Sequence, residues 1–186
     1  MRTPSPALSR ATAALAVAAL VVAGVSGCFA TPPTDEQVTV SLETADGTPV
    51  ELAAVLPGGA VDAGPVSPSS CVDDAQAWEL PSIDDSIISF ATVSAATACP
   101  DERPVNGRFP SWTDAASLPD HAVPIDVPGV PAAHRFSLRY TECTNFCTDW
   151  MRELALLELD GATVLVAGTG PSAERFDELL ASIEVR

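Results

Sequence analysis

The 186-residue chain contains no lysine. Its nine basic residues are all arginines, they are set against 25 aspartates and glutamates, and the formal net charge is −16. A protein this acidic repels nucleic acids and anionic lipid headgroups, so we expect neither as a partner. The charge favours solubility and indicates little about the fold.

Residues with recognisable chemistry are also scarce. There are 2 histidines, His121 and His134. Because serine and aspartate are plentiful, a Ser-His-Asp arrangement can be drawn with either one, so this is no evidence for a catalytic triad. The G-x-S-x-G sequence of α/β-hydrolases is missing. Residues 168–172, GTGPS, lack the spacing and the lysine of phosphate-binding loops and are predicted to form a tight strand-to-helix turn. We expect a non-enzymatic protein; the alternative is a surface hydrolase that uses His121 or His134.

No metal or cofactor is predicted. The acidic pairs at residues 73–74 and 84–85 lack the ligand spacing of a calcium-binding loop and are expected to be solvated turns. The length suits one domain with a full hydrophobic core rather than two.

The N-terminal segment has the pattern of a secretory signal. Residues 1–10 carry two arginines and no acid, and residues 11–25 are uncharged and apolar. This apolar run of about 15 residues is shorter than the about 20 that a membrane-spanning helix needs. We therefore predict a signal peptide over residues 1–27, with a retained transmembrane anchor as the alternative.

The four residues Val25, Ser26, Gly27 and Cys28 resemble the lipobox of bacterial lipoproteins. The resemblance implies that Cys28 receives a diacylglyceryl group through a thioether, and that the chain is then cut between Gly27 and Cys28. Two acyl chains anchor a protein stably, whereas one holds it only reversibly. The alternative is an ordinary secreted protein with a free thiol at Cys28.

The lipobox resemblance also implies a location. Residues 28–37 would form a lipidated tether, and residues 38–186 a single extracytoplasmic domain held at the cell membrane. The expected partners are membrane lipid, through Cys28, and an unknown envelope protein or small ligand.

Alternating apolar and polar residues predict several β-strands. Residues 38–43 and 49–56 form one predicted hairpin, and residues 152–159 and 162–168, joined by Asp160-Gly161, form another. Residues 77–80, 86–95 and 134–140 are further expected strands. Residues 152–159 are apolar on both faces, as is typical of a central strand.

The C-terminal residues predict an amphipathic helix. Ser172 suits the N-cap position, and one apolar stripe follows along the helix at Phe176, Leu179, Leu180 and Ile183. The predicted fold class is therefore α+β: an antiparallel sheet of about six strands, with the C-terminal helix packed on one face, preceded by a cleaved signal helix. This order of hairpin and helix resembles the last third of Mog1/PsbP-like bacterial lipoproteins.

Residues 100–133 contain seven prolines and show no helical or strand period. A loop this long is usually functional, held down or disordered. Three interpretations of residues 100–133 are therefore open: an ordered segment packed over the core, a mobile segment, or a lid over a ligand-binding site.

The other four cysteines, Cys71, Cys99, Cys143 and Cys147, form an even set in an exported domain, which predicts two disulfides. We favour Cys143–Cys147, because the intervening loop is short, and then Cys71–Cys99 by elimination; the crossed pairings remain open. A zinc site that joins Cys143 and Cys147 to His121 or His134 matches known spacings poorly.

Overall fold

The computed structural model of the protein describes residues 34–65, 72–80, 86–93, 118–143 and 145–186. They belong to one unit, Pro32–Arg186. The predicted signal segment at residues 1–27, the lipobox and Cys28 lie outside the described residues. In the part that is described, no helix is both long and apolar enough to span a bilayer.

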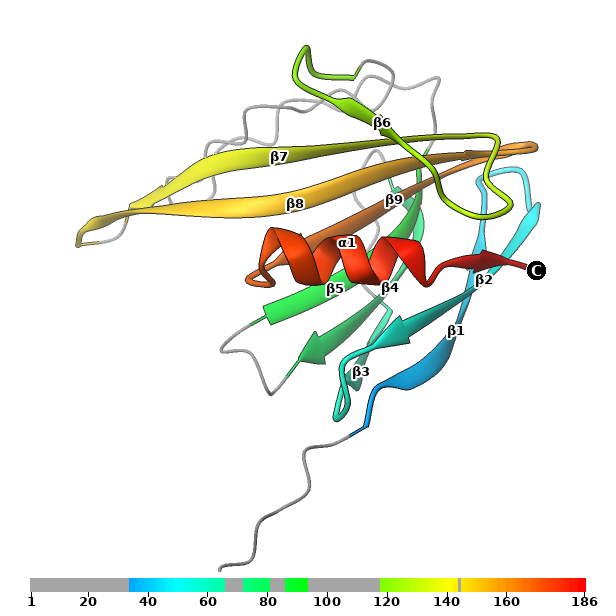
Figure 1. Ribbon diagram of the computed structural model, residues 1–186, viewed down its shortest axis with the longest axis horizontal. Coiled ribbons are helices and arrows are strands. Elements are labelled where there is room, and N and C mark those ends of the chain that lie inside the picture. Colours follow the sequence, from blue (N-terminus) through cyan, green and yellow to red (C-terminus); the bar gives the residue numbers. More distant parts are fainter. Residues whose placement is uncertain (1–33, 66–71, 81–85, 94–117, 144) are drawn as a thin grey trace, which may run out of the picture. The chain divides into compact units, whose positions relative to one another are not determined.

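Seven antiparallel strands form the larger sheet, in the order β3-β4-β5-β9-β8-β7-β6 (Figure 1). Asp160 and Gly161 connect the central strands, which confirms the predicted hairpin, and Gly161 has a φ of 84°. The strands are β3 (Val61–Pro65), β4 (Val72–Leu80), β5 (Ser86–Val93), β6 (Val123–Ile125), β7 (Ala132–Cys143), β8 (Cys147–Leu159) and β9 (Ala162–Thr169).

A second sheet has three strands, in the order β1-β2-β10. They are β1 (Glu36–Glu43), β2 (Pro49–Leu56) and β10 (Glu184–Val185). β1 and β2 pair along their whole length, so the predicted N-terminal hairpin is confirmed. The last strand pairs with the middle of β2, and the backbone N–H of Arg186 donates to the carbonyl of Glu51 at 3.0 Å.

The one helix among the described residues is α1 (Ala173–Ala181). Ser172 is its N-cap, as predicted, and the Ser172 hydroxyl accepts a hydrogen bond from the backbone N–H of Arg175. The predicted apolar stripe is buried and belongs to the main core; its members are Phe176, Leu179, Leu180 and Ile183.

The predicted α+β class, with one sheet of about six strands, is wrong. The described chain is nearly all β, with ten strands in two sheets and a single helix of 9 residues. The alternation of apolar and polar residues shows that one face of a strand is buried, but not which sheet the strand joins. The sequence therefore did not indicate that β1 and β2 form a sheet of their own. The short strands β3, β6 and β10 have no period of their own.

The main core lies between the two sheets and α1. It brings Leu52 and Leu56 of the smaller sheet together with Phe90 and Val166 of the larger one. A second cluster covers the opposite face of the larger sheet and includes Leu154 and Leu156 of β8. Because neighbouring residues on a strand face opposite sides, β8 is buried on both, as its sequence indicated.

The two sheets are joined at one corner by the buried side chain of Thr92 on β5. Its hydroxyl donates to the carbonyl of Glu43 on β1 at 2.6 Å and accepts from the backbone N–H of Asp74 on β4 at 3.1 Å. The Asp74 carboxylate in turn accepts from the backbone N–H of Glu43. These bonds satisfy backbone groups where a bulge interrupts β4.

The described end of the proline-rich segment, residues 118–133, is ordered over the sheet. Residues 123–125 form β6, against the expectation that no strand occurs there, and pair with β7. In the loop that follows, Val127 is only 2% exposed and its carbonyl accepts from the N–H of Val130. Of the three alternatives, this part matches a segment held on the core; residues 100–117 lie outside the described ranges.

The two outermost strands of the larger sheet, β3 and β6, are short. β6 is a three-residue strand with Pro124 at its centre. β3 has five residues, an irregular register between Asp62 and Gly64, and Pro65 at its end. Short, proline-containing or bulged edges offer few backbone groups to another strand.

Candidate functional site

A polar cluster joins α1 to the larger sheet. Arg135 on β7 lies against Glu153 on β8 (Nη2 to Oε2, 3.0 Å) and against Asp177 on α1 (Nε to Oδ1, 2.5 Å). The Ser137 hydroxyl donates to the same Glu153 oxygen at 2.6 Å. We call these four residues the Arg135 cluster.

The polar groups of the Arg135 cluster contact one another. Glu153 is 8% exposed, and a buried carboxylate of this kind needs the arginine and the hydroxyl as partners. The Arg135 guanidinium also lies 5.8 Å from the ring centroid of Phe176 on α1, a cation–π distance. This arrangement suits a structural connection between helix and sheet.

The two candidate histidines lie away from this cluster. His121 is exposed, and its Nε2 is 2.9 Å from the backbone carbonyl of Ser137. His134 lies on β7 opposite Leu156, and its Nδ1 is buried without a hydrogen-bond partner. Because adjacent residues on a strand face opposite sides, His134 and Arg135 occupy different faces of the sheet. Among the described residues, no contact of His121 or His134 is with a carboxylate.

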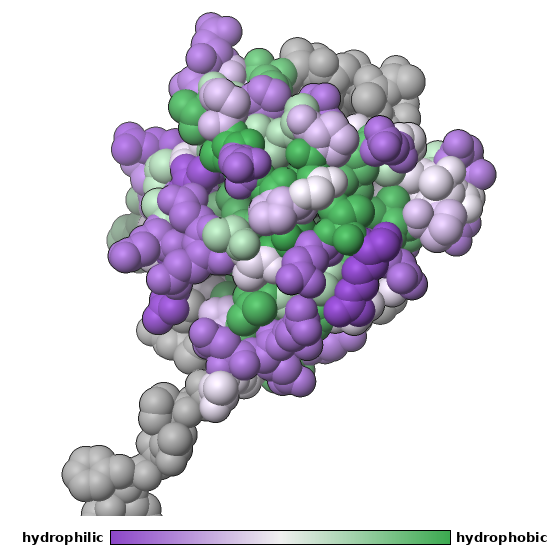
Figure 2. Space-filling view, turned by 45° about the vertical axis from the view of Figure 1, so that its right-hand side comes forward, coloured by the Kyte–Doolittle hydropathy of each residue, from purple (hydrophilic) through white to green (hydrophobic). Residues whose placement is uncertain are grey.

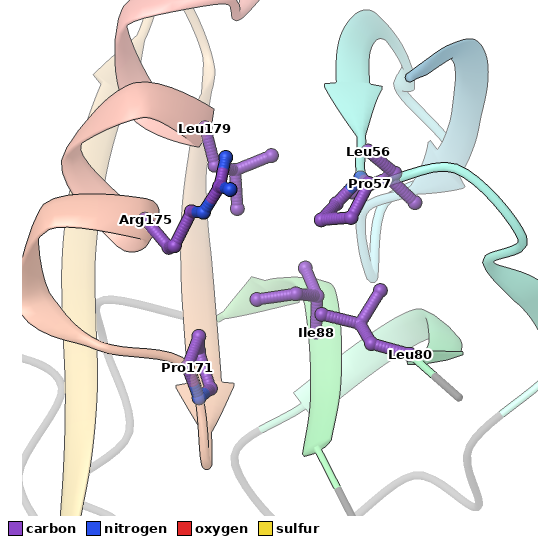
Figure 3. A pocket seen from close by; sticks show the side chains of 7 residues that line it. All are labelled: Leu56, Pro57, Leu80, Ile88, Pro171, Arg175 and Leu179. Carbon is purple, nitrogen blue, oxygen red and sulfur yellow. The ribbon is translucent and has the colours of Figure 1, made fainter. Parts of the chain in front are cut away.

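A small apolar cleft opens at one end of the domain. Figure 3 shows α1 and the turn before it on one side, with the ends of β2 and β4 and the start of β5 on the other. Its free volume of about 10 Å³ holds about one water molecule. The lining residues are Leu56, Pro57, Leu80, Ile88, Pro171, Arg175 and Leu179.

Residues 170–172 form a tight turn, within the segment 168–172 for which the sequence predicted one. β9 ends at Thr169 and α1 begins at Ala173. Gly170 has a φ of 93°, which side chains other than glycine rarely tolerate. The turn packs closely against Ser86, so it leaves no open glycine loop for a phosphate at this position.

The structure describes only part of the predicted cysteine set. Cys147 is disulfide-bonded. Its backbone lies directly opposite Cys143 in the register of β7 and β8. Cys71 and Cys99, like the side chain of Cys143, lie outside what is described, so the pairing of the four cysteines stays a prediction.

The expectation that the acidic pair at residues 73–74 is a solvated turn is wrong: both residues lie half-buried in β4, and Asp74 accepts backbone hydrogen bonds where β1 meets β4. Residues 84–85 lie outside the described ranges. Within those ranges, no three His, Cys, Asp or Glu side chains are grouped as a metal site would require.

Sequence reasoning missed the exposed apolar side chains. Phe146, at the tip of the β7–β8 hairpin, is 82% exposed. An aromatic residue inside the loop CTNFC was the available signal, because a three-residue connection offers nothing to bury it. Among the described residues, the other large exposed apolar side chains are Val61, Ile87, Val123, Met151 and Val185.

Comparisons with known proteins assign the chain to no group. No model of a protein family and no curated protein matches it.

Proposed function

We propose that this chain is a membrane-anchored bacterial lipoprotein whose nearly all-β domain is a non-enzymatic binding or accessory module of the cell envelope. One observation carries the proposal: a lipobox cysteine, Cys28, precedes the first strand closely, since β1 begins at Glu36. Residues 29–35, at about 3.3 Å each, reach about 23 Å at most. The domain would therefore stay near the membrane surface.

The chemistry of the anchor follows from the motif. The Cys28 thiolate is the nucleophile that takes the diacylglyceryl group, and cleavage after Gly27 leaves Cys28 as the first residue. Two acyl chains hold the protein on the extracytoplasmic face of the cell membrane. We also favour two disulfides in the domain, one of them Cys143–Cys147.

An envelope protein is the partner that we favour over a small ligand. The apolar cleft beside α1, which the described residues form, has room for about one water and does not accommodate a small molecule. The side that carries α1 and β10 instead presents apolar surface near its centre, surrounded by hydrophilic side chains (Figure 2). On β10, Val185 is 38% exposed and lies close to Gly129.

The hydrolase alternative has no comparable support. It requires His121 or His134 beside a nucleophile or a carboxylate. The observed contact of His121 is with a backbone carbonyl, and His134 faces an apolar neighbour across the strand pair. We therefore do not propose it.

Intact-mass measurement of the protein from the membrane fraction tests the anchor. We expect a species that begins at Cys28 and carries diacylglyceryl, and a Cys28→Ser variant that keeps residues 1–27 and gains no lipid. A wild-type protein that is uncleaved, or cleaved but unlipidated, would overturn the proposal.

Photo-cross-linking in cells tests the partner. A cross-linking residue at position 185 should capture an envelope protein, while the same residue at Ala45, in the exposed β1–β2 turn, is the matched control. Equal capture from both positions would argue against a specific binding surface.

A further inference from the structure

Strand register shows where the tether leaves the domain. β1 begins at Glu36, which pairs with Leu56 at the end of β2. Leu56 lines the apolar cleft together with Leu80, at the end of β4, and Ile88, near the start of β5. The chain from Cys28 therefore enters the domain where β2 and β4 end and β5 begins. We call this the tether end.

Two exposed apolar side chains belong to the strands of the tether end. Val61, 53% exposed, is the first residue of β3 and pairs with Glu79 near the end of β4. Ile87, 42% exposed, follows the first residue of β5 and pairs with Thr169, the last residue of β9.

The β7–β8 hairpin projects from the same end. β8 pairs with β9 only from Arg152 onward, and residues 147–151 pair with β7 alone. In Figure 1 the hairpin extends to the left, on the side where β5 begins. Six residues beyond Arg152 give a projection of about 20 Å. Phe146 at the tip is 82% exposed, and Met151 is 48% exposed.

The large exposed apolar side chains are thus unevenly distributed over the described residues. Four of the six belong to the tether end: Val61, Ile87, Phe146 and Met151. Exposed apolar groups concentrated in one region mark an interaction surface, whereas scattered ones need no explanation.

We propose that the tether end rests against the lipid bilayer, with Phe146 and Met151 in the boundary between headgroups and acyl chains. This inference depends on the proposed anchor at Cys28. The tether reaches about 23 Å and the hairpin projects about 20 Å, so an anchored chain holds the hairpin tip within reach of the membrane.

Apolar insertion rather than charge provides the attraction. The chain has a net charge of −16, which opposes binding to anionic headgroups. An aromatic side chain on a projecting loop gains by leaving water at the bilayer interface. Contact with the membrane should therefore persist in high salt, unlike contact made by a basic surface.

Fluorescence quenching by brominated lipid tests the inference. Full-length lipidated protein is placed in phosphatidylcholine vesicles, with or without bromine on the acyl chains, as wild type and as Phe146→Trp. The 3 native tryptophans give the background that is subtracted. We expect the added Trp fluorescence to be lost in brominated vesicles. The matched control, Val123→Trp, lies away from the tether end and should be quenched no more than wild type.

Flotation with the vesicles separates the two proposals. Protein that fails to float overturns the anchor. Protein that floats while the tryptophan at position 146 stays unquenched overturns the membrane contact and leaves the anchor intact. Cross-linked dimers together with an unquenched, blue-shifted tryptophan would show that a second copy covers Phe146, which also overturns the inference.

Discussion

Gly170, in the turn before α1, lies directly against Ser86 at the start of β5. A Cβ atom on Gly170 would stand 2.2 Å from the Ser86 hydroxyl oxygen and 3.0 Å from its Cα. Atoms do not approach so closely, and Gly170 also has a φ of 93°. The turn that leads into helix α1 therefore requires a glycine at position 170.

Gly170→Ala should destabilise the protein in two ways, through backbone strain and through the clash with Ser86. Gly161→Ala is the matched control, because Gly161 also has a positive φ but nothing lies within 4 Å of an added Cβ. We expect a loss of about 1–2 kcal/mol for the control and about 1–3 kcal/mol more for Gly170→Ala. Urea unfolding measures both, and equal losses would show that the contact with Ser86 is immaterial.

Arg135→Met should weaken the attachment of α1 to the sheet. It leaves the Glu153 carboxylate buried without its cation, which we expect to cost about 2–4 kcal/mol of unfolding free energy. Arg175→Met is the control, because the Arg175–Glu178 pair is more than half exposed on both sides and should contribute under about 0.5 kcal/mol.

A second change checks the cause of the Arg135 effect. Glu153→Gln in the Arg135→Met background replaces the unpaired charge by a neutral amide and should recover part of the stability. No recovery would indicate that the lost cation–π contact with Phe176, rather than the charge, explains the result.

Asp46 should make stability depend on acid. Hydrogen bonds from the Thr44 hydroxyl, and then from the hydroxyl and backbone N–H of Thr48, lower the pKa of Asp46 from its ordinary value of 3.8. A lowered pKa stabilises the fold above 3.8, and this contribution is lost as the pH falls through the folded-state value. Asp46→Asn should therefore unfold at lower urea than wild type at neutral pH, with the difference disappearing in strong acid. A difference that stays constant with pH would contradict this assignment.

The predicted Cys143–Cys147 disulfide has a direct test. Trypsin cuts after Arg139 and Arg152, so both cysteines fall in one peptide, residues 140–152. Without reduction we expect this peptide alone, unlabelled by iodoacetamide and lighter than the dithiol by its thiol hydrogens. A peptide joined to another that carries Cys71 or Cys99 would show a crossed pairing.

Local structure was largely predictable from the sequence. Asp160-Gly161 between two apolar runs specified the β8–β9 hairpin, and Ser172 ahead of a regular apolar stripe specified α1. In these cases the determining interactions lie within a few residues of each other along the chain.

The arrangement of the strands was less predictable, because it depends on residues far apart. Thr92, Asp74 and Glu43 meet only where the two sheets join, and no pattern around any of them indicates this contact. The Arg135 cluster likewise combines β7, β8 and α1, and the residues next to Arg135 in the sequence do not indicate its partners on β8 and α1.

The edges of the larger sheet have a consequence for crowding. Proteins attached to one membrane diffuse in two dimensions and collide repeatedly in similar orientations. A long open strand would then let each copy add to its neighbour, as in the growth of a fibre. Pro124 in the middle of β6 and the irregular, proline-ended β3 leave these two outer strands few backbone groups to offer to a neighbouring copy. On the proposed anchor, β3 and β6 would therefore not extend from one copy to the next in a crowded layer.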